Sequence, residues 1–268
     1  MSPARTRGTV TRALASLRGT FDLLISLTAS DFRTRYGHGP FLLVRWLLEP
    51  FALVGVYLVL MVVVLDRPGN APGLSIACAI VPFQLVMNAV TNGMGSVAVR
   101  RPIIANMAFR RSLIPLSSVL TESASFVASF AIIATMMILY GVSPTPALLW
   151  LPVVVGVTLT VAAGLAYPAS LFGVWFRELR PFGTSVVRIL FFIGPGLVPL
   201  AEASEDARDW LRLNPLTGLF ESFRDVFLYG QSPAAWQLLS PLVFAALLLV
   251  VAVPLYRREQ REFAKVIT

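Results

Sequence analysis

The stretch Ser30–Pro50, SDFRTRYGHGPFLLVRWLLEP, runs without a pause from a basic polar segment into a strongly apolar one. Arg33, Arg35 and Tyr36 precede the apolar run, and the sequence Gly-His-Gly-Pro at 37–40 ends any helix that reaches it. The apolar run is long enough to cross a hydrocarbon core, which requires about 20 helical residues. The stretch therefore predicts a short polar helix that ends at the threshold of a first membrane span.

The composition of the whole chain supports this interpretation. Of its 268 residues, 56% are hydrophobic and 13% are charged, and the mean hydropathy is +0.76. A soluble domain needs roughly 25% charged residues to cover its surface. The net charge of +8 does not indicate nucleic-acid binding, because the basic residues lie between apolar runs instead of forming one dense tract.

The apolar runs predict an all-α polytopic membrane protein with six transmembrane helices in a single domain, 1–268. The predicted spans are 42–65, 74–98, 113–140, 148–174, 182–200 and 236–256. An even number of spans places both termini on one side of the membrane.

The distribution of basic residues predicts which side that is. One side carries Arg5, Arg7, Arg12, Arg18, Arg33, Arg35, Arg45, Arg100, Arg101, Arg110, Arg111, Arg177, Arg180, Arg257, Arg258, Arg261 and Lys265. The other side carries only Arg67, Arg208, Arg212 and Arg224, together with many acidic residues. The positive-inside rule therefore predicts cytoplasmic termini, with 1–40 as a cytoplasmic N-terminal segment.

Residues 20–36 predict an amphipathic helix in the plane of the membrane surface. Apolar side chains recur with helical spacing, and polar ones occupy the rest of the wheel. The candidate residues are Phe21, Leu24, Ile25, Phe32, Arg33, Arg35 and Tyr36. Two interpretations remain open: a simple membrane anchor, or a helix that also contacts a partner protein.

The segment 201–235 before the last span is long and half apolar. Gly194-Pro195-Gly196 and Pro199 interrupt span five, and short helical patterns follow. Irregular backbone at membrane depth survives only where it is buried in protein or faces water. We therefore expect an external re-entrant hairpin, with a folded loop resting on the bilayer as the alternative.

Motifs for catalysis and for ATP binding are missing from the sequence. Lys265 is the only lysine, so no P-loop can form, and any ATP that drives this protein must bind to another chain. There is no Gly-x-Ser-x-Gly elbow, and Cys78 and His38 are each the single residue of their type, so no Cys- or two-His metal site is expected. We expect no enzyme activity and no cofactor on this chain.

Ionisable residues inside the predicted spans are few: Glu49, Glu122 and Arg188. Such residues are functional candidates because a charge in hydrocarbon costs at least about 2.5–3.5 kcal/mol. Their scarcity argues against an ion-coupled carrier. Glu122 has either a helix-packing role or a gating role, and a pair with Arg188 is conceivable.

The loop that follows span two is the best candidate for a partner site. Arginines flank an apolar centre, and Pro102 is placed for the first turn of a short helix that can dock in a groove. The residues are Arg100, Arg101, Ile103, Ile104, Met107, Phe109, Arg110 and Arg111. A role in fixing the orientation of the chain in the membrane would explain these arginines, but it would not explain the apolar residues between them.

These features together resemble a known family. Arg35-Tyr36, then Trp46 and Pro50, a helix-bearing loop after span two, and Asn214-Pro215-Leu216 with Phe223-Arg224 are similar in order to permeases of the type-2 ATP-binding-cassette (ABC-2) exporters. Within that family the chain resembles the polysaccharide exporters of the Wzm and TagG type, which export O-antigens and teichoic acids. The Arg- and Ala-rich character resembles the actinobacterial branch that exports a lipid-linked cell-wall galactan.

The resemblance implies a homodimer with two ABC ATPase subunits, which bind ATP and Mg, in a bacterial inner membrane. It implies a coupling helix near 101–111, an ATPase-facing helix near 20–36, and a polyprenyl-linked glycan as substrate. Spans one, two and five would line a channel, and the segment around 201–230 would close it outside. The implied channel residues are Phe51, Tyr57, Phe83, Phe182, Phe191 and Phe192, and the implied gate residues are Asn214, Pro215, Phe220, Glu221 and Arg224. A drug or small-lipid exporter of the same family, and an intramembrane lipid-modifying enzyme, are the alternatives.

Overall fold

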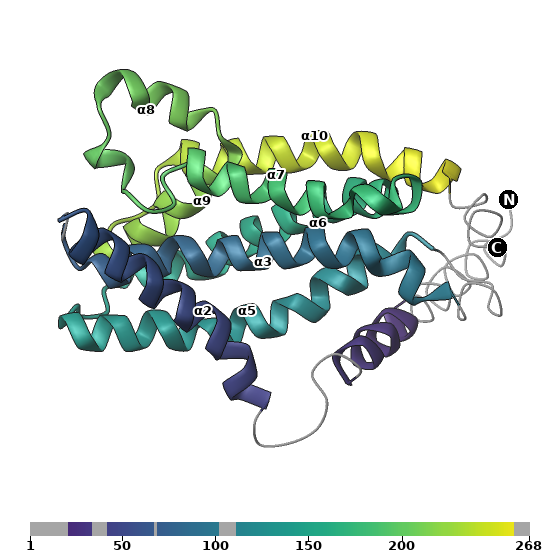
Figure 1. Cartoon of the computed structure of the whole chain (residues 1–268), viewed down its shortest axis with the longest axis horizontal. Coiled ribbons are helices and arrows are strands. Elements are labelled where there is room, and N and C mark those ends of the chain that lie inside the picture. Colours follow the sequence, from purple (N-terminus) through teal and green to yellow (C-terminus); the bar gives the residue numbers. More distant parts are fainter. Residues whose placement is uncertain (1–20, 34–41, 67–68, 102–110, 260–268) are drawn as a thin grey trace, which may run out of the picture.

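The computed structural model describes residues 21–33, 42–66, 69–101 and 111–259, and every regular element in these ranges is helical. A helix at 21–33 is followed by α2 (Leu42–Val59), which continues as a π-turn to Val64. The further helices are α3 (Pro72–Val99), α5 (Leu113–Tyr140), α6 (Leu151–Trp175), α7 (Arg180–Ile193), α8 (Glu205–Arg212), α9 (Pro215–Arg224) and α10 (Ala235–Glu259). Figure 1 shows most of them running side by side along the long axis.

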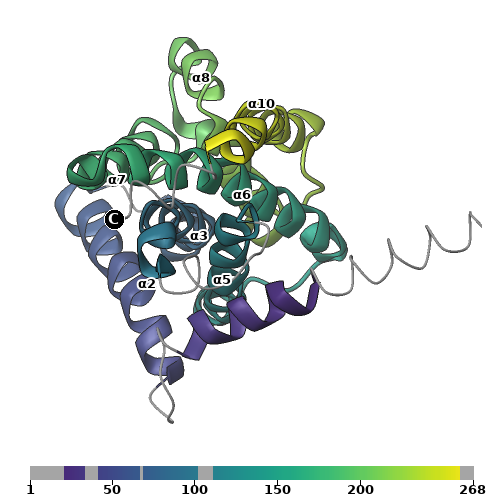
Figure 2. The ribbon, with the colours of Figure 1, turned by 90° about the vertical axis from the view of Figure 1, so that its right-hand side faces the viewer.

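Helix α3 forms the centre of the bundle. Seen along the long axis, it lies inside a ring of other helices (Figure 2), and it packs against α2, α5, α6, α7 and α9. Of its most apolar 18-residue window, 89% is buried, against 17–33% for α5, α6 and α10. An α-helix pairs its backbone groups within itself, so it can cross a membrane. Because α3 is also apolar all round, it can be enclosed by other helices without contact with lipid.

Small residues allow the neighbouring helices to come close to α3 and to each other. A Cβ added at Gly173 of α6 would overlap the Met94 carbonyl of α3, and one at Gly164 would lie 3.0 Å from Ala245 of α10. Helix association in membranes relies on this kind of close backbone approach, because lipid is as apolar as leucine. The packing of α3, α6 and α10 therefore depends on glycine at these positions.

Within the described residues, four helical segments are long and apolar enough to cross a membrane: Pro72–Val99, Leu113–Tyr140, Pro146–Trp175 and Ala235–Glu259. They correspond to the second, third, fourth and sixth predicted spans. The first predicted span appears as a shorter apolar helix, Leu48–Val64, and the fifth ends at Ile193 because Gly194-Pro195-Gly196 interrupts it. At 1.5 Å per residue, the 14 residues of α7 cover about 21 Å, less than a hydrocarbon core of about 30 Å.

The two ends of the bundle differ in character. The helix at 21–33, the C-terminal end of α3 and the C-terminal end of α10 lie at one end (Figure 1). Helices α8 and α9 lie at the other, where α8 projects from the bundle. The helix at 21–33 crosses the bundle axis instead of running along it, which is the orientation expected for a helix at a membrane surface (Figure 2).

We expect Gly173→Ala to destabilise the protein by about 1–3 kcal/mol, because the new methyl group forces α6 away from Met94. Cys78, the only cysteine, is fully buried, so a thiol-reactive fluorogenic dye reports unfolding directly during a thermal ramp in detergent. Gly156→Ala in the same helix is the matched control, because nothing lies within 4 Å of its added Cβ. Equal unfolding temperatures for the two variants would contradict the packing argument.

Candidate functional site

A buried guanidinium organises the end of the bundle that carries α8 and α9. Arg224 of α9 is fully buried, and its Nη1 donates to Glu221 Oε1 at 2.7 Å and to the Pro195 carbonyl at 2.6 Å. Its Nη2 donates to the Gly196 carbonyl at 3.0 Å, and its Nε to Ser75 Oγ at 3.1 Å. One side chain therefore joins α9, the start of α3 and the broken segment after α7.

The same region is held by three further hydrogen bonds. Asn214 caps α9 by accepting from the Leu216 amide at 3.0 Å, and its Nδ2 donates to the Leu190 carbonyl of α7 at 2.6 Å. The Leu200 amide donates to Glu221 Oε1 at 3.1 Å. The predicted gate residues Asn214, Pro215, Phe220, Glu221 and Arg224 thus lie together on or beside α9. Asn214, Glu221 and Arg224 form hydrogen bonds within this one chain, and a gating role stays a prediction.

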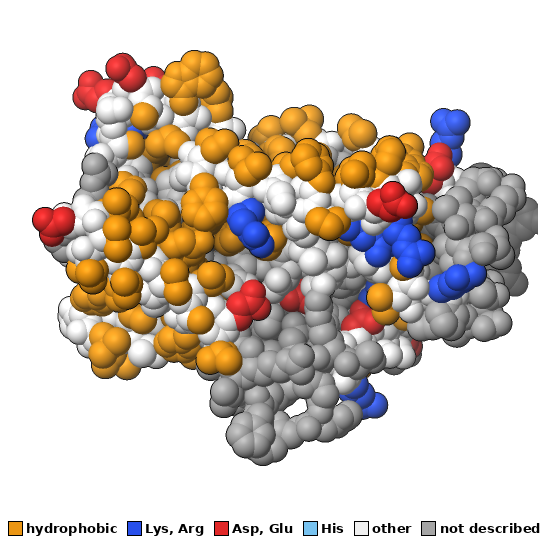
Figure 3. Space-filling view, viewed as in Figure 1, with side chains coloured by type: hydrophobic (Ala, Val, Ile, Leu, Met, Phe, Trp, Pro, Cys, Tyr) orange, Lys and Arg blue, Asp and Glu red, His pale blue; other side chains and the backbone are white. Residues whose placement is uncertain are grey.

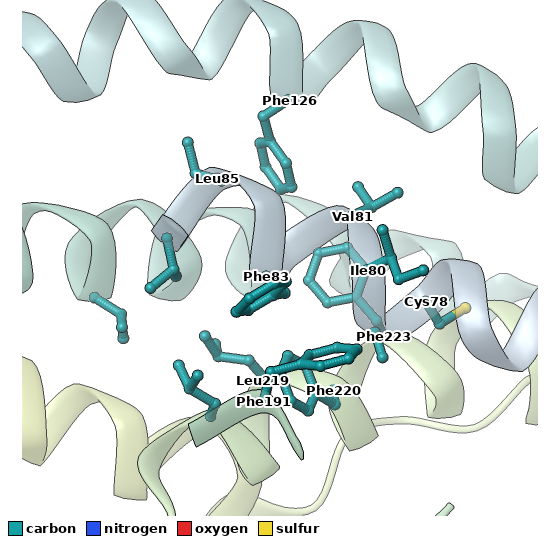
Figure 4. Close-up of a cluster of buried hydrophobic side chains, with 14 of the residues drawn as sticks. Cys78, Ile80, Val81, Phe83, Leu85, Phe126, Phe191, Leu219, Phe220 and Phe223 are labelled. Atoms are coloured by element: carbon teal, nitrogen blue, oxygen red, sulfur yellow. The ribbon is translucent and has the colours of Figure 1, made fainter. Parts of the chain in front are cut away.

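Aromatic rings fill the space between α3, α7 and α9. Phe83 and Phe191 contact each other with centroids 4.4 Å apart and ring planes tilted by 33°, and Phe220 contacts Phe191 at 5.6 Å (Figure 4). Both Phe83 and Phe191 are buried, so in this structure these two channel candidates lie in the core of the chain. Sequence could not show this, because α7 is apolar on both its buried and its exposed sides.

The remaining channel candidates lie on the surface formed by α2 and α7. Phe182 and Phe192 are 65% and 52% exposed, and Tyr57 joins the two helices through a ring contact with Phe192 at 6.1 Å. Phe51 is half-buried on α2. A broad apolar surface with few charged side chains covers this face of the molecule (Figure 3).

Among the side chains that the structure describes on these helices, two charged ones are exposed. Arg188 of α7 lies between the exposed apolar residues Val186 and Ile189, and Glu49 is exposed near the start of the described part of α2. Arg188 forms no ion pair with any residue of the described ranges, so the conceivable Glu122–Arg188 pair is not formed. Glu122 is instead buried and accepts from Asn92 Nδ2 at 2.9 Å, which links α5 to α3.

A second buried arginine organises the opposite end of α3. Arg100 is 4% exposed and forms an ion pair with Asp31 of the helix at 21–33. It also donates to Ser117 Oγ of α5 at 2.8 Å and to the Ser96 carbonyl at 3.3 Å. Burial lowers the pKa of Arg100 to about 10, so the side chain remains charged at neutral pH. The pair fastens the N-terminal helix to α3 and α5 next to the predicted partner loop.

Most of the predicted partner loop lies outside the described residues. This applies to Ile103, Ile104, Met107, Phe109 and Arg110, and also to Arg35 and Tyr36. Arg101 and Arg111 flank the loop, with Arg101 exposed and Arg111 half-buried. On the N-terminal helix, Phe21 and Ile25 are exposed and Leu24 and Phe32 are half-buried, with Arg33 exposed at its end.

Sequence reasoning missed the residues that anchor these two sites. Asp31 and Leu27 lie on the inward side of the helix at 21–33, and Ser75 and Ser117 accept from the two buried arginines. The signal available was the spacing of Leu24, Leu27 and Asp31, which places them on one helix face. In the described part of the chain, no group of three His, Cys, Asp or Glu side chains is arranged to hold a metal ion.

Apolar helices around a central helix, joined at both ends by buried arginines, define a polytopic helical membrane protein. The chain is 30% identical over 259 residues to the O-antigen export system permease protein RfbA of Myxococcus xanthus, an alignment that covers 95% of this chain and 97% of the relative. Two Klebsiella pneumoniae proteins of the same name are each 25% identical over 251 residues, 92% of this chain and 95% of theirs. No protein-family model matches the chain. The chain belongs to the family of ABC-2 type O-antigen export permeases, which confirms the resemblance found in the sequence.

We expect Arg224→Gln to lower stability by about 3–5 kcal/mol, because it leaves the Glu221 carboxylate buried without its cation. The measurement is the temperature at which Cys78 becomes reactive to the fluorogenic thiol dye. The matched control is Arg212→Gln, since Arg212 pairs with Asp209 at 3.6 Å in an exposed position and such pairs contribute about 0–1 kcal/mol. The double variant Glu221→Gln, Arg224→Met should regain part of the stability that Arg224→Gln loses, because it no longer buries an unpaired carboxylate. No regained stability would contradict this explanation.

Asp31→Asn should weaken the attachment of the N-terminal helix by about 1.5–3 kcal/mol, the range for hydrogen bonds to charged groups. Hydrogen–deuterium exchange of residues 21–33 in detergent would then become faster, while exchange in α3 stays slow. Asp22→Asn on the exposed side of the same helix is the control. Unchanged exchange in the Asp31 variant would show that the ion pair does not hold the helix.

Proposed function

We propose that this chain is the permease subunit of an ATP-driven exporter that moves a lipid-linked polysaccharide, O-antigen-like or galactan-like, across the bacterial inner membrane. Family membership supports the export class, because the relatives are named as O-antigen export permeases. With Lys265 as its only lysine, the chain contains no P-loop, so the proposal requires a separate ATPase subunit that binds ATP and Mg.

The proposed transport path rests on one observation, the exposed face of α7. Only Val187 and Phe191 of this helix are buried, and Arg188 is exposed among apolar residues. An arginine facing hydrocarbon is costly, so this face requires a water-lined path or a partner. We propose that two copies of the chain meet around this face and that Arg188, Phe182 and Phe192 border the channel between them.

In the proposed topology six segments cross the membrane. Helix α2 with its π-turn provides the first span, and α7 with residues 194–200 provides the fifth, in addition to the four long helices. Both termini are cytoplasmic, in line with the basic residues at that end and the positive-inside rule. The segment 201–235 is the external re-entrant gate, and its support is the broken backbone after Ile193, whose carbonyls accept from buried Arg224.

The proposed coupling route begins at the arginine-flanked loop. Closure of the paired ATPases would press on residues 101–111 and shift the equilibrium between two states of the permease. Arg100 stands directly before this loop and contacts the N-terminal helix and α5. A displacement of the loop would therefore reach both of these elements through one side chain.

Deletion of the gene should make lipid-linked glycan accumulate inside the cell and disappear from its surface, as read by labelling intact cells with a glycan-specific lectin. The wild-type chain should restore export and should co-purify with an ATP-binding-cassette ATPase at near-equal amount. The variant Ile104→Asp, Phe109→Asp should insert normally, as shown by unchanged Cys78 protection, yet fail to export, because two carboxylates replace apolar docking residues.

Three outcomes would contradict the proposal. Unchanged export by the Ile104 and Phe109 variant would remove the coupling role of the loop. Raised drug sensitivity without glycan accumulation would favour the drug or small-lipid exporter. A chain that purifies alone and modifies lipids by itself would favour the intramembrane enzyme.

A further inference from the structure

A basic cavity lies at the end of the bundle that carries the N-terminal helix, separate from the buried Arg100 pair. It has a volume of about 170 Å³ and is bordered by the C-terminal ends of α3 and α6 and the start of α7. It is lined by Arg101, which follows the end of α3, by Arg177 of the 3-10 turn Arg177–Leu179, and by Arg180 at the start of α7, next to Gly173 and Val97. The space is sufficient for several waters or one polyatomic anion.

The three arginines lack acidic partners within the described residues. None of the ion pairs formed there includes Arg101, Arg177 or Arg180, and Glu178 does not line the cavity although it follows Arg177 directly. Three like charges around one concave surface repel each other and concentrate a positive potential in it. An anion in the cavity would relieve this repulsion.

One of the arginines is held in position. Arg180 donates from Nη2 and Nε to the Gly173 carbonyl at 3.0 and 3.3 Å. Its guanidinium is therefore anchored to the end of α6. The first turn of α7 begins at the same residue, and helix N-termini favour anions. Arg101 and Arg177 are exposed and reach the cavity from the other two elements.

The positive-inside rule alone would account for arginines at this end of the bundle. It does not require that they converge on one cavity, and the exposed arginines at the end of α10, Arg257 and Arg258, do not line it. Arginine side chains gather on this part of the molecule, close to apolar side chains (Figure 3). The shared cavity and the positive charge around it therefore indicate a binding site, in addition to any role of these arginines in orienting the chain in the membrane.

Exposed aromatic residues beside the cavity indicate where its ligand resides. Trp175, Phe176 and Leu179 are 46%, 49% and 50% exposed; the two aromatic residues directly precede Arg177, and Leu179 directly precedes Arg180. Aromatic side chains of this kind collect at the level of lipid headgroups. A ligand with a phosphate in the cavity and an acyl or prenyl tail beside these side chains would match both features, whereas a protein carboxylate would use only the charges.

We propose that the cavity formed by Arg101, Arg177 and Arg180 binds the phosphate or diphosphate headgroup of a membrane lipid. The lipid is either the carrier of the exported glycan or a bulk anionic phospholipid. The first of these sources rests on the proposed function, while the headgroup chemistry does not.

The test measures binding of radiolabelled farnesyl diphosphate to the purified permease–ATPase complex in nanodiscs of phosphatidylcholine. The variant Arg101→Gln, Arg177→Gln keeps the Arg180–Gly173 contact and should bind at least about tenfold more weakly, since it loses two charge-assisted contacts. The matched control Arg257→Gln, Arg258→Gln removes two exposed charges at the same end of the bundle and should bind as the wild type does. Protection of Cys78 from the thiol dye checks that each variant is folded.

Competition assigns the source of the headgroup. Displacement of the probe by unlabelled farnesyl diphosphate, but not by farnesol or by nanodiscs containing phosphatidylglycerol, supports the lipid carrier. Equal displacement by phosphatidylglycerol supports a bulk phospholipid at the same site.

Wild-type affinity in the Arg101 and Arg177 variant would overturn the proposal. Loss of ATPase co-purification by that variant with unchanged probe binding would also overturn it, because the arginines would then hold a protein carboxylate. Glycan export in cells is measured separately, so failure of headgroup binding and failure of the proposed export function give different results.

Discussion

The buried guanidinium of Arg224 connects three separate parts of its end of the bundle. It is placed on α9, yet its contacts reach the first turn of α3 and the carbonyls of Pro195 and Gly196. Those carbonyls become free because glycine and proline end α7 early, and in a membrane protein free carbonyls need an internal donor. The break in α7 and the charge on α9 are therefore parts of one arrangement: without the cation, the broken segment would have to be solvated or refolded.

Arg100 has an equivalent position at the other end of the same central helix. Ser75, which accepts from Arg224, lies in the first turn of α3, and Arg100 caps its C-terminal end. The 28 residues of α3 span about 42 Å, so one continuous and almost fully buried helix joins the two arginine sites. In the proposed exporter this places a rigid element between the ATPase-facing loop and the external segment, and it explains how both ends of the protein can respond to one displacement.

Much of this organisation was predictable from residue patterns. The four long helices, the interruption after Ile193 and the surface helix at 21–33 follow from hydropathy, Gly-Pro chemistry and amphipathic spacing, which act over short distances along the chain. The family resemblance rested on motifs such as Asn214-Pro215-Leu216, whose asparagine indeed caps α9. The site was predicted less well. Glu122 pairs with Asn92 and not with Arg188, and Phe83 and Phe191 are core residues, because apolar helices look alike whichever side faces the protein.

The sequence by itself determined that this chain is a helical membrane protein, where its helices begin and break, and to which family it belongs. The membrane class and the limits of the helices depend on the cost of unpaired backbone groups and of charge in hydrocarbon, which can be read residue by residue. Family membership depends on which residues follow one another along the chain. Only the tertiary structure decided which helix is central, which arginines are buried and which converge on an open cavity. In a bilayer, hydrophobicity does not distinguish a neighbouring helix from lipid, so these choices depend on close packing at residues such as Gly173 and on contacts between residues far apart in the chain.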